Sequence, residues 1–352
     1  MQADMLLRLM AEKNASDLHL RVPGPPVFRI DGILVPQEEL SLTSPTDLKE
    51  AFEQITTTSQ RNAFYKDLEL DFAYSLPGVA RFRVNAMLQR GTLSIAFRRV
   101  PFELPNIDKL ELPSLCKDLI LKPRGLILVT GPTGSGKSTT LAAMIDYLNE
   151  HERRNVITIE DPIEYLYPNK LCLLAQRDMG DDTRSFSNAL IHALRHDPDV
   201  ILVGEMRDLD TISTAITAAE TGHLVLGTLH TIDAVQTVDR IIDAFPPEHQ
   251  RQIRLQLAQV LEAVLSQSLL PRIEGKGRIG AFEILIATPA VRNMIRTTKT
   301  HELPSAIQLG ANEGMQTLNQ ALAMLVNGNK VAIEEALRKS SNPEQLKKLV
   351  MH

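Results

Sequence analysis

The chain of 352 residues has a hydrophobic content of 43% and a charged content of 23%, as expected for a globular protein of two or three domains. A net charge of −5 and only 4% aromatic residues, with no Trp, argue against direct binding of nucleic acid. The cysteines Cys116 and Cys172 are too few for a four-cysteine zinc module, and the lack of a membrane-span or signal pattern predicts a cytoplasmic protein.

Residues 1–100 are predicted to form a small α+β domain. Apolar residues recur at helical spacing over 3–13 and 44–55. Alternation of apolar and polar residues predicts half-buried antiparallel strands further along. These strand-like segments are 17–22, 27–35, 69–76, 80–88 and 93–100.

Residues 101–113 are rich in proline and are interpreted as a linker to a second domain. From 114 to 288 the pattern changes to short, nearly continuous apolar runs separated by helix-like segments, which is typical of a parallel sheet in an α/β domain. The runs are 125–131, 155–161, 199–205 and 224–230. Residues 289–352 are predicted to be wholly helical.

The strongest motif is "GPTGSGKST", which follows a strand-like run and precedes a helical one, as a phosphate-binding loop requires. Its backbone N–H groups are expected to surround phosphate oxygens at the helix N-terminus. Lys137 would neutralise the β- and γ-phosphates of ATP, and Ser138 would ligate Mg²⁺. The nucleotide-binding residues predicted here are Gly131, Pro132, Thr133, Gly134, Ser135, Gly136, Lys137, Ser138 and Thr139.

A second strand, within "DPDVILVGEMRD", is expected to end beside this loop. Many P-loop enzymes end this strand with an Asp that organises the metal, but here Gly204 takes that place and Glu205 follows it. Binding and catalytic residues of open α/β sheets lie at the carboxyl ends of the strands. Glu205 is therefore the candidate that polarises the attacking water.

An acidic cluster, Glu160, Asp161 and Glu164, follows the strand of "ITIEDPIEY". If that strand lies beside the P-loop strand, Glu160 or Asp161 would order water or Mg²⁺. The alternative is a solvated acidic loop, and the spacing alone does not separate the two interpretations.

The stretch "TGHLVLGTLHT" places histidines at both ends of one predicted strand. Seven residues at about 3.3 Å each separate them by about 23 Å, so they cannot share a metal ion. His230 follows the strand and would sense the γ-phosphate or orient Glu205. His223 lies at the opposite end and suits a contact between subunits or domains. Either histidine, taken alone, is also compatible with a structural role.

These four motifs resemble those of the secretion ATPase superfamily, and specifically of the type IV pilus retraction motors (the PilT family). The resemblance extends to "SDLHLRVPGPPVFRIDG", which is similar to the PAS-like N-terminal domain of that family. It implies a RecA-like ATPase core, Glu205 as the catalytic glutamate with His230 and Glu160 beside it, and ATP with Mg²⁺. It also implies a homohexameric ring that acts on an inner-membrane pilus platform protein, at the cytoplasmic face of that membrane.

The same resemblance suggests that arginines of the N-terminal domain reach the nucleotide of a neighbouring subunit, with Arg81, Arg83 and Arg98 as candidates. The segment "AVRNMIR" is similar to a signature of retraction motors, which makes Arg292 and Asn293 candidates for coupling, although Thr297 stands where the signature has an acid. The implied function is pilus retraction. The alternatives are a related ATPase that moves protein or DNA, a pilus paralogue without a retraction role, and a regulator whose hydrolysis is vestigial.

Overall fold

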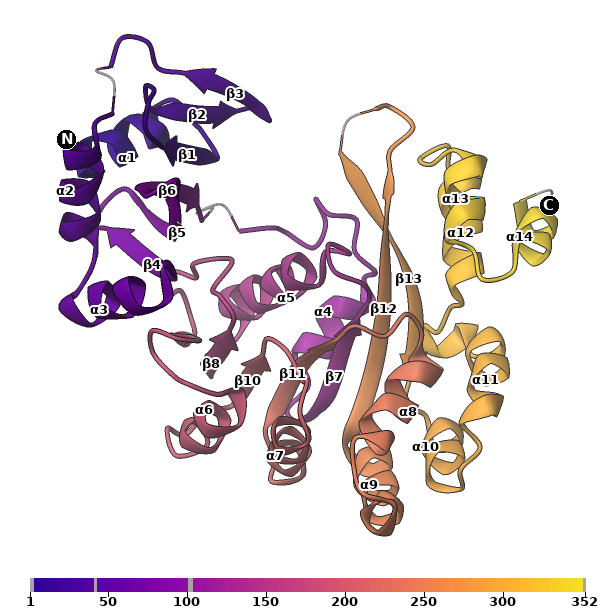
Figure 1. Ribbon diagram of the computed structural model, residues 1–352. Coiled ribbons are helices and arrows are strands. Elements are labelled where there is room, and N and C mark those ends of the chain that lie inside the picture. Colours follow the sequence, from indigo (N-terminus) through magenta and orange to yellow (C-terminus); the bar gives the residue numbers. More distant parts are fainter. Residues whose placement is uncertain (1–2, 41–42, 101–103, 276, 351–352) are drawn as a thin grey trace. The chain divides into compact units, whose positions relative to one another are not determined.

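The computed structural model describes residues 3–40, 43–100, 104–275 and 277–350 (Figure 1). The chain forms two compact units. One comprises Met1–Glu103 with Glu164–Leu166, and the other comprises Leu104–Ile163 with Tyr167–His352. The first three residues of the predicted linker, 101–103, lie outside the described residues. The four-part domain division stays a prediction.

The first unit is a six-stranded antiparallel sheet in the order β3-β2-β1-β6-β5-β4. One face packs against α1 and α2, where Leu6, Phe52 and Phe97 are buried. The opposite face carries charged side chains of β1, β5 and β6. The strands are β1 (Asp17–Leu20), β2 (Val27–Ile30), β3 (Ile33–Pro36), β4 (Glu69–Leu76), β5 (Ala80–Gln89) and β6 (Thr92–Arg99), and the helices are α1 (Ala3–Glu12), α2 (Pro45–Ile55) and α3 (Thr58–Asp67).

The predicted strand over 27–35 is wrong, because two strands occupy it. Asp31 and Gly32 both have positive φ, at 48° and 84°. This is the Asp-Gly signature of a tight hairpin turn. β2 and β3 therefore pair with each other across the turn.

The second unit contains a seven-stranded sheet in the order β13-β12-β7-β11-β10-β8-β9. Every neighbouring pair is parallel except β12 and β13, which form a long antiparallel hairpin (Figure 1). The predicted parallel arrangement is confirmed for the four runs, and β9 and the β12–β13 hairpin are additional strands. The strands are β7 (Gly125–Thr130), β8 (Asn155–Glu160), β9 (Leu173–Asp178), β10 (Val200–Val203), β11 (Leu224–Leu229), β12 (Leu261–Pro271) and β13 (Arg278–Ile286).

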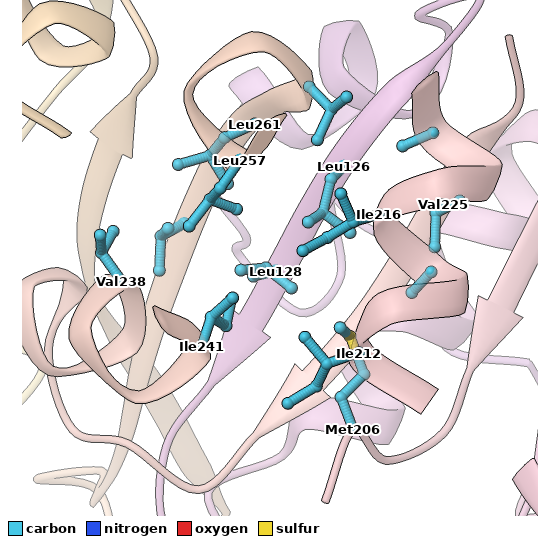
Figure 2. Packing of buried hydrophobic residues seen from close by; sticks show 14 of the residues in the cluster. Leu126, Leu128, Met206, Ile212, Ile216, Val225, Val238, Ile241, Leu257 and Leu261 are labelled. Carbon is cyan, nitrogen blue, oxygen red and sulfur yellow. The ribbon is translucent and has the colours of Figure 1, made fainter. Parts of the chain in front are cut away.

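Helices cover both faces of this sheet. Figure 2 shows Leu126 of β7 beside Ile216 of α7, and Leu128 near Ile212 of α7 and Ile241 of α8. Ile127 and Val129, which alternate with them, face α4 and α5 instead. The strand is buried on both sides, which fixes the position of the loop that follows it. The helices are α4 (Leu115–Ile120), α5 (Lys137–His151), α6 (Phe186–Ala193), α7 (Leu209–Glu220), α8 (Ala234–Asp243) and α9 (Pro247–Val260).

The region after β13 is helical, as predicted, and packs partly on the β12–β13 hairpin. Leu322 and Leu346 form a small core with Leu270 and Ile279 of the hairpin. None of the helices in the described part of the chain is long and apolar enough to span a bilayer. The helices here are α10 (Pro289–Arg296), α11 (Leu303–Leu309), α12 (Leu318–Asn327), α13 (Ile333–Lys339) and α14 (Pro343–Val350), with short 3₁₀ turns at Thr300–Glu302 and Ala311–Glu313.

Candidate active site

The glycine-rich loop connects the end of β7 at Thr130 to the start of α5 at Lys137, in the strand–loop–helix order that the motif predicts. Helix α5 begins without a side-chain cap, and its N-cap residue Gly136 has a φ of 92°. Lys137 Nζ donates hydrogen bonds to the carbonyl oxygens of Gly131 (2.8 Å) and Pro132 (3.2 Å). An ammonium group held over an uncapped helix N-terminus is the arrangement that attracts phosphate.

Two residues of the loop, Gly131 and Ser135, are closely constrained by their surroundings. Gly131 has a φ of 140°, and a Cβ there would lie 2.4 Å from the carbonyl oxygen of Gln267, so only glycine is accommodated. Ser135 is 4% exposed, and its hydroxyl has no hydrogen-bond partner within the described structure. A buried hydroxyl without a protein partner is suited to a ligand oxygen.

Glu205 and His230 come together at the carboxyl edge of the sheet. Glu205 follows β10, His230 follows the adjacent β11, and His230 Nε2 lies 2.8 Å from Glu205 Oε1. His230 Nδ1 lies 3.5 Å from the hydroxyl of Thr133 in the glycine-rich loop. A neutral imidazole that donates from Nε2 accepts at Nδ1, so His230 connects the loop to Glu205. Arg207, which the sequence patterns did not single out, also forms an ion pair with Glu205.

The missing strand-end aspartate has a steric cause. A Cβ on Gly204 would lie 2.9 Å from the carbonyl oxygen of Ile159 and 3.1 Å from the Cα of Glu160. Strand β8 therefore passes too close for any side chain at position 204. The acid occupies position 205, where the chain has left the strand.

The acidic cluster is only partly arranged as the sequence suggests. β8 does not lie beside β7, because β11 and β10 separate them, so the condition attached to Glu160 and Asp161 is not met. Glu160 is buried and accepts hydrogen bonds from Thr158 (2.6 Å) and Gln176 (3.3 Å). It is nevertheless the last residue of β8, the strand next to β10, so it lies at the same sheet edge as Glu205.

His223 precedes β11 and lies at the opposite end of that strand from His230, as predicted. Its Nδ1 is 2.9 Å from the carbonyl oxygen of Ala218, near the end of α7. This contact is a local structural one. In the part of the chain that the structure describes, no cluster of three His, Cys, Asp or Glu side chains is arranged to bind a metal.

The candidate arginines lie on β5 and β6 of the first unit, on the sheet face opposite α1 and α2. Arg83 Nη2 is 3.5 Å from Glu164 of the acidic cluster, and Arg98 Nε is 2.8 Å from the buried Asp17. Arg81 donates to Ser75 (3.3 Å) on the neighbouring strand. Arg83 and Arg98, which pair across β5 and β6, line one shallow cavity of about 280 Å³.

The predicted coupling residues differ in their surroundings. Arg292 points inward, where its guanidinium donates to the carbonyl oxygens of Ala258 (2.8 Å) and Gln259 (2.6 Å) and to Glu262 (2.7 Å). Asn293 is exposed and accepts a hydrogen bond from Arg296. Glu262 in turn crowds Gly125, the first residue of β7, where a Cβ would lie 2.4 Å from Glu262 Cγ.

A partly buried carboxylate, Glu283 of β13, was not expected from the sequence. Its Oε1 accepts a hydrogen bond from the backbone N–H of Ala234 (2.9 Å), the first residue of α8. Loss of hydration raises the pKa of this carboxyl above its ordinary value, and the nearby Asp233 adds to the effect. The cross-strand neighbour of Glu283 is Ser266 of β12.

Comparison with known proteins assigns the family. Residues 4–338 match the model of the family described as "Type II/IV secretion system protein". A "Type IV pilus retractation ATPase PilT" of Pseudomonas aeruginosa is 48% identical over 339 residues, which cover 96% of this chain and 98% of that protein. A "Twitching motility protein" of Neisseria gonorrhoeae is 47% identical over 321 residues, which cover 91% and 86%.

A solved structure gives the same assignment. The crystal structure of the pilus retraction motor PilT with bound ADP matches with a TM-score of 0.91 and 44% identity, over 99% of both chains. The resemblance inferred from the motifs is therefore confirmed. The chain belongs to the type II/IV secretion system protein family.

Proposed function

We propose that this member of the secretion ATPase family is the ATP-hydrolysing motor of type IV pilus retraction. The observation that carries the proposal is the contact of His230 with both Thr133 of the glycine-rich loop and Glu205. This cluster brings the expected catalytic acid to the edge of the nucleotide loop. The near-complete coverage of retraction-motor relatives supports the mechanical role.

Each residue in the site has a distinct task in hydrolysis. Lys137, fixed over the loop by the carbonyl oxygens of Gly131 and Pro132, neutralises charge on the β- and γ-phosphates. Glu205 accepts the proton of the attacking water or polarises it. His230 holds the Glu205 carboxylate in one orientation through its 2.8 Å contact. Ser138 would hold Mg²⁺, which when bound neutralises phosphate charge.

A ring of six copies would complete the site with a cation from a neighbour. Arg81 and Arg83 are the candidates that the resemblance favours, and Arg98 is the third. Ion pairs do not separate them, because Arg83 pairs with Glu164 and Arg98 pairs with Asp17. An arginine supplied in trans contributes about 10³–10⁵-fold to phosphoryl transfer. Mixing Lys137→Ala subunits with Arg81→Ala/Arg83→Ala subunits, each inactive alone, should restore part of the activity. If rings made only of the double variant hydrolyse ATP normally, the arginines have no such role.

Two measurements test the function. Release of phosphate from ATP by the purified protein tests the enzyme, and its absence would favour a vestigial regulator. Deletion of the gene should leave cells with an excess of pili that do not retract. Normal pilus number and normal retraction would instead favour a related ATPase that moves protein or DNA, or a pilus paralogue without a retraction role.

A further inference from the structure

Strand β12 lies directly beside β7, on the side away from His230. At the level where β7 ends, β12 carries two consecutive buried polar residues, Ser266 (2% exposed) and Gln267 (4% exposed). Polar side chains in such a position are costly unless they are hydrogen-bonded. Both residues contact the glycine-rich loop or the residues that flank it.

Gln267 contacts both ends of the loop. Its backbone carbonyl oxygen occupies the space in which a Cβ of Gly131 would lie, at 2.4 Å, and its side-chain Nε2 does the same at Gly136, at 2.8 Å. Its Oε1 accepts a hydrogen bond of 2.8 Å from the hydroxyl of Thr140, in the first turn of α5. One residue thus borders the first glycine of the loop, the last glycine, and the helix that follows.

Ser266 contributes on the other face of the sheet. Its hydroxyl lies 2.9 Å from that of Thr130, the last residue of β7. The strand end is held by Ser266, and the loop ends are bordered by Gln267. Gly131, whose position Gln267 restricts, also supplies the carbonyl oxygen that accepts from Lys137.

We propose that Gln267 is a positioning residue of the nucleotide site: it sets the distance and orientation between the two ends of the glycine-rich loop, and with them the Lys137 ammonium. This inference rests on the proposed function, because it assumes that the loop binds the phosphates of ATP. In this proposal Gln267 acts through its contacts with Gly131, Gly136 and Thr140. Its loss should therefore weaken binding of phosphate-bearing nucleotides.

The test compares Gln267→Met, which keeps an unbranched side chain but removes the amide, with a matched control. Asn149 is a fully buried amide at the far end of the same helix α5, where it bonds to Pro168, Lys170 and Cys172. Asn149→Met should lower the melting temperature and leave the Kd for fluorescent ADP within about twofold of wild type. Gln267→Met should raise that Kd about tenfold, the equivalent of about 1.4 kcal/mol, with adenosine binding unchanged.

The outcomes separate the two proposals. If the wild-type protein fails to bind ADP, the proposed function fails first. If wild type binds ADP and the two Met variants weaken binding equally, or neither does, Gln267 only packs and the inference is overturned. Should Gln267→Met fail to fold, Thr140→Val removes the donor to Gln267 and leaves the glutamine in place. A rise of at least threefold in the Kd then supports the inference, and a smaller change overturns it.

Discussion

The P-loop strand β7 has two neighbours with opposite character. On the β11 side, His230 is 45% exposed in its side chain and contacts Glu205, which is 16% exposed. On the β12 side, Ser266 and Gln267 are almost wholly buried and form hydrogen bonds with Thr130 and Thr140. In our proposals, the β11 side supplies groups to the reacting atoms and the β12 side positions the loop. Substitutions on the first side should change turnover, whereas those on the second should change binding and stability.

Lys137, which lies between the two sides, should show the largest effect. Lys137→Ala removes the cation over the loop, so ATP hydrolysis should fall to the background of a phosphate-release assay. Nucleotide affinity should fall as well, measured with fluorescent ADP. If the purified variant hydrolyses ATP at the wild-type rate, the assignment of the glycine-rich loop to the active site is wrong.

On the β11 side, Glu205→Gln keeps the shape of the side chain but removes its charge. The rate constant kcat should fall by roughly 10²–10⁴-fold, the contribution typical of a general base. ATP binding should persist, measured by equilibrium titration. If kcat falls by less than tenfold, another acid serves as the general base. Measuring kcat of Glu160→Gln then tests whether that acid is Glu160.

His230 and His223 lie at opposite ends of β11, so substituting each in turn compares the two ends of one strand. A hydrogen bond to a charged group contributes about 1.5–3 kcal/mol, so His230→Ala should lower kcat by roughly 10- to 100-fold with little change in KM. His223→Ala should leave kcat per assembled ring near wild type and disturb assembly, measured by size-exclusion chromatography. If His230→Ala and His223→Ala lower kcat equally, the assignment of His230 to catalysis and His223 to assembly is wrong. Loss of activity with a zinc-selective chelator would point to a metal instead.

On the β12 side, the smallest effect should come from Glu283. A carboxyl whose pKa is higher in the folded chain binds its proton more tightly there than when unfolded. Its contribution to the free energy of unfolding is therefore full below the ordinary pKa of 4.5 and is lost as the pH rises through the higher folded pKa. Glu283→Gln should flatten this part of the pH profile, measured by urea unfolding at several pH values. If the free energies of unfolding of Glu283→Gln and wild type differ by the same amount at every pH, the prediction for Glu283 is wrong.

The sequence predicts the β11 side far better than the β12 side. Glu205 and His230 follow apolar runs, and parallel strands end at one edge, so the sequence predicts that both residues lie at that edge. Their direct contact depends on β10 and β11 being neighbours, which only the fold shows. Gln267 has no comparable signal. Helix α9 ends at Val260 and β12 begins at Leu261, with no glycine or proline between them to mark the change. The importance of Gln267 arises from the sheet order, which places β12 next to β7.

The unmet condition on Glu160, that β8 lies beside β7, has the same origin. A run of acids after a strand indicates the edge at which they lie but not how many strands separate them from the loop. Gly204 shows the converse case: the sequence reveals that the usual aspartate is absent, and only the approach of β8 explains why. Local patterns predict elements and edges, whereas the order of strands requires the fold.

The inward position of Arg292 has a mechanical consequence. Its guanidinium ties α10 to the end of α9 and to Glu262, which packs over Gly125 at the foot of β7. Strand β7 is hydrogen-bonded along its length to β11 on one side and β12 on the other. The glycine-rich loop follows the opposite end of this strand. The contacts of Arg292 and the loop are therefore connected by a single strand that is supported on both sides.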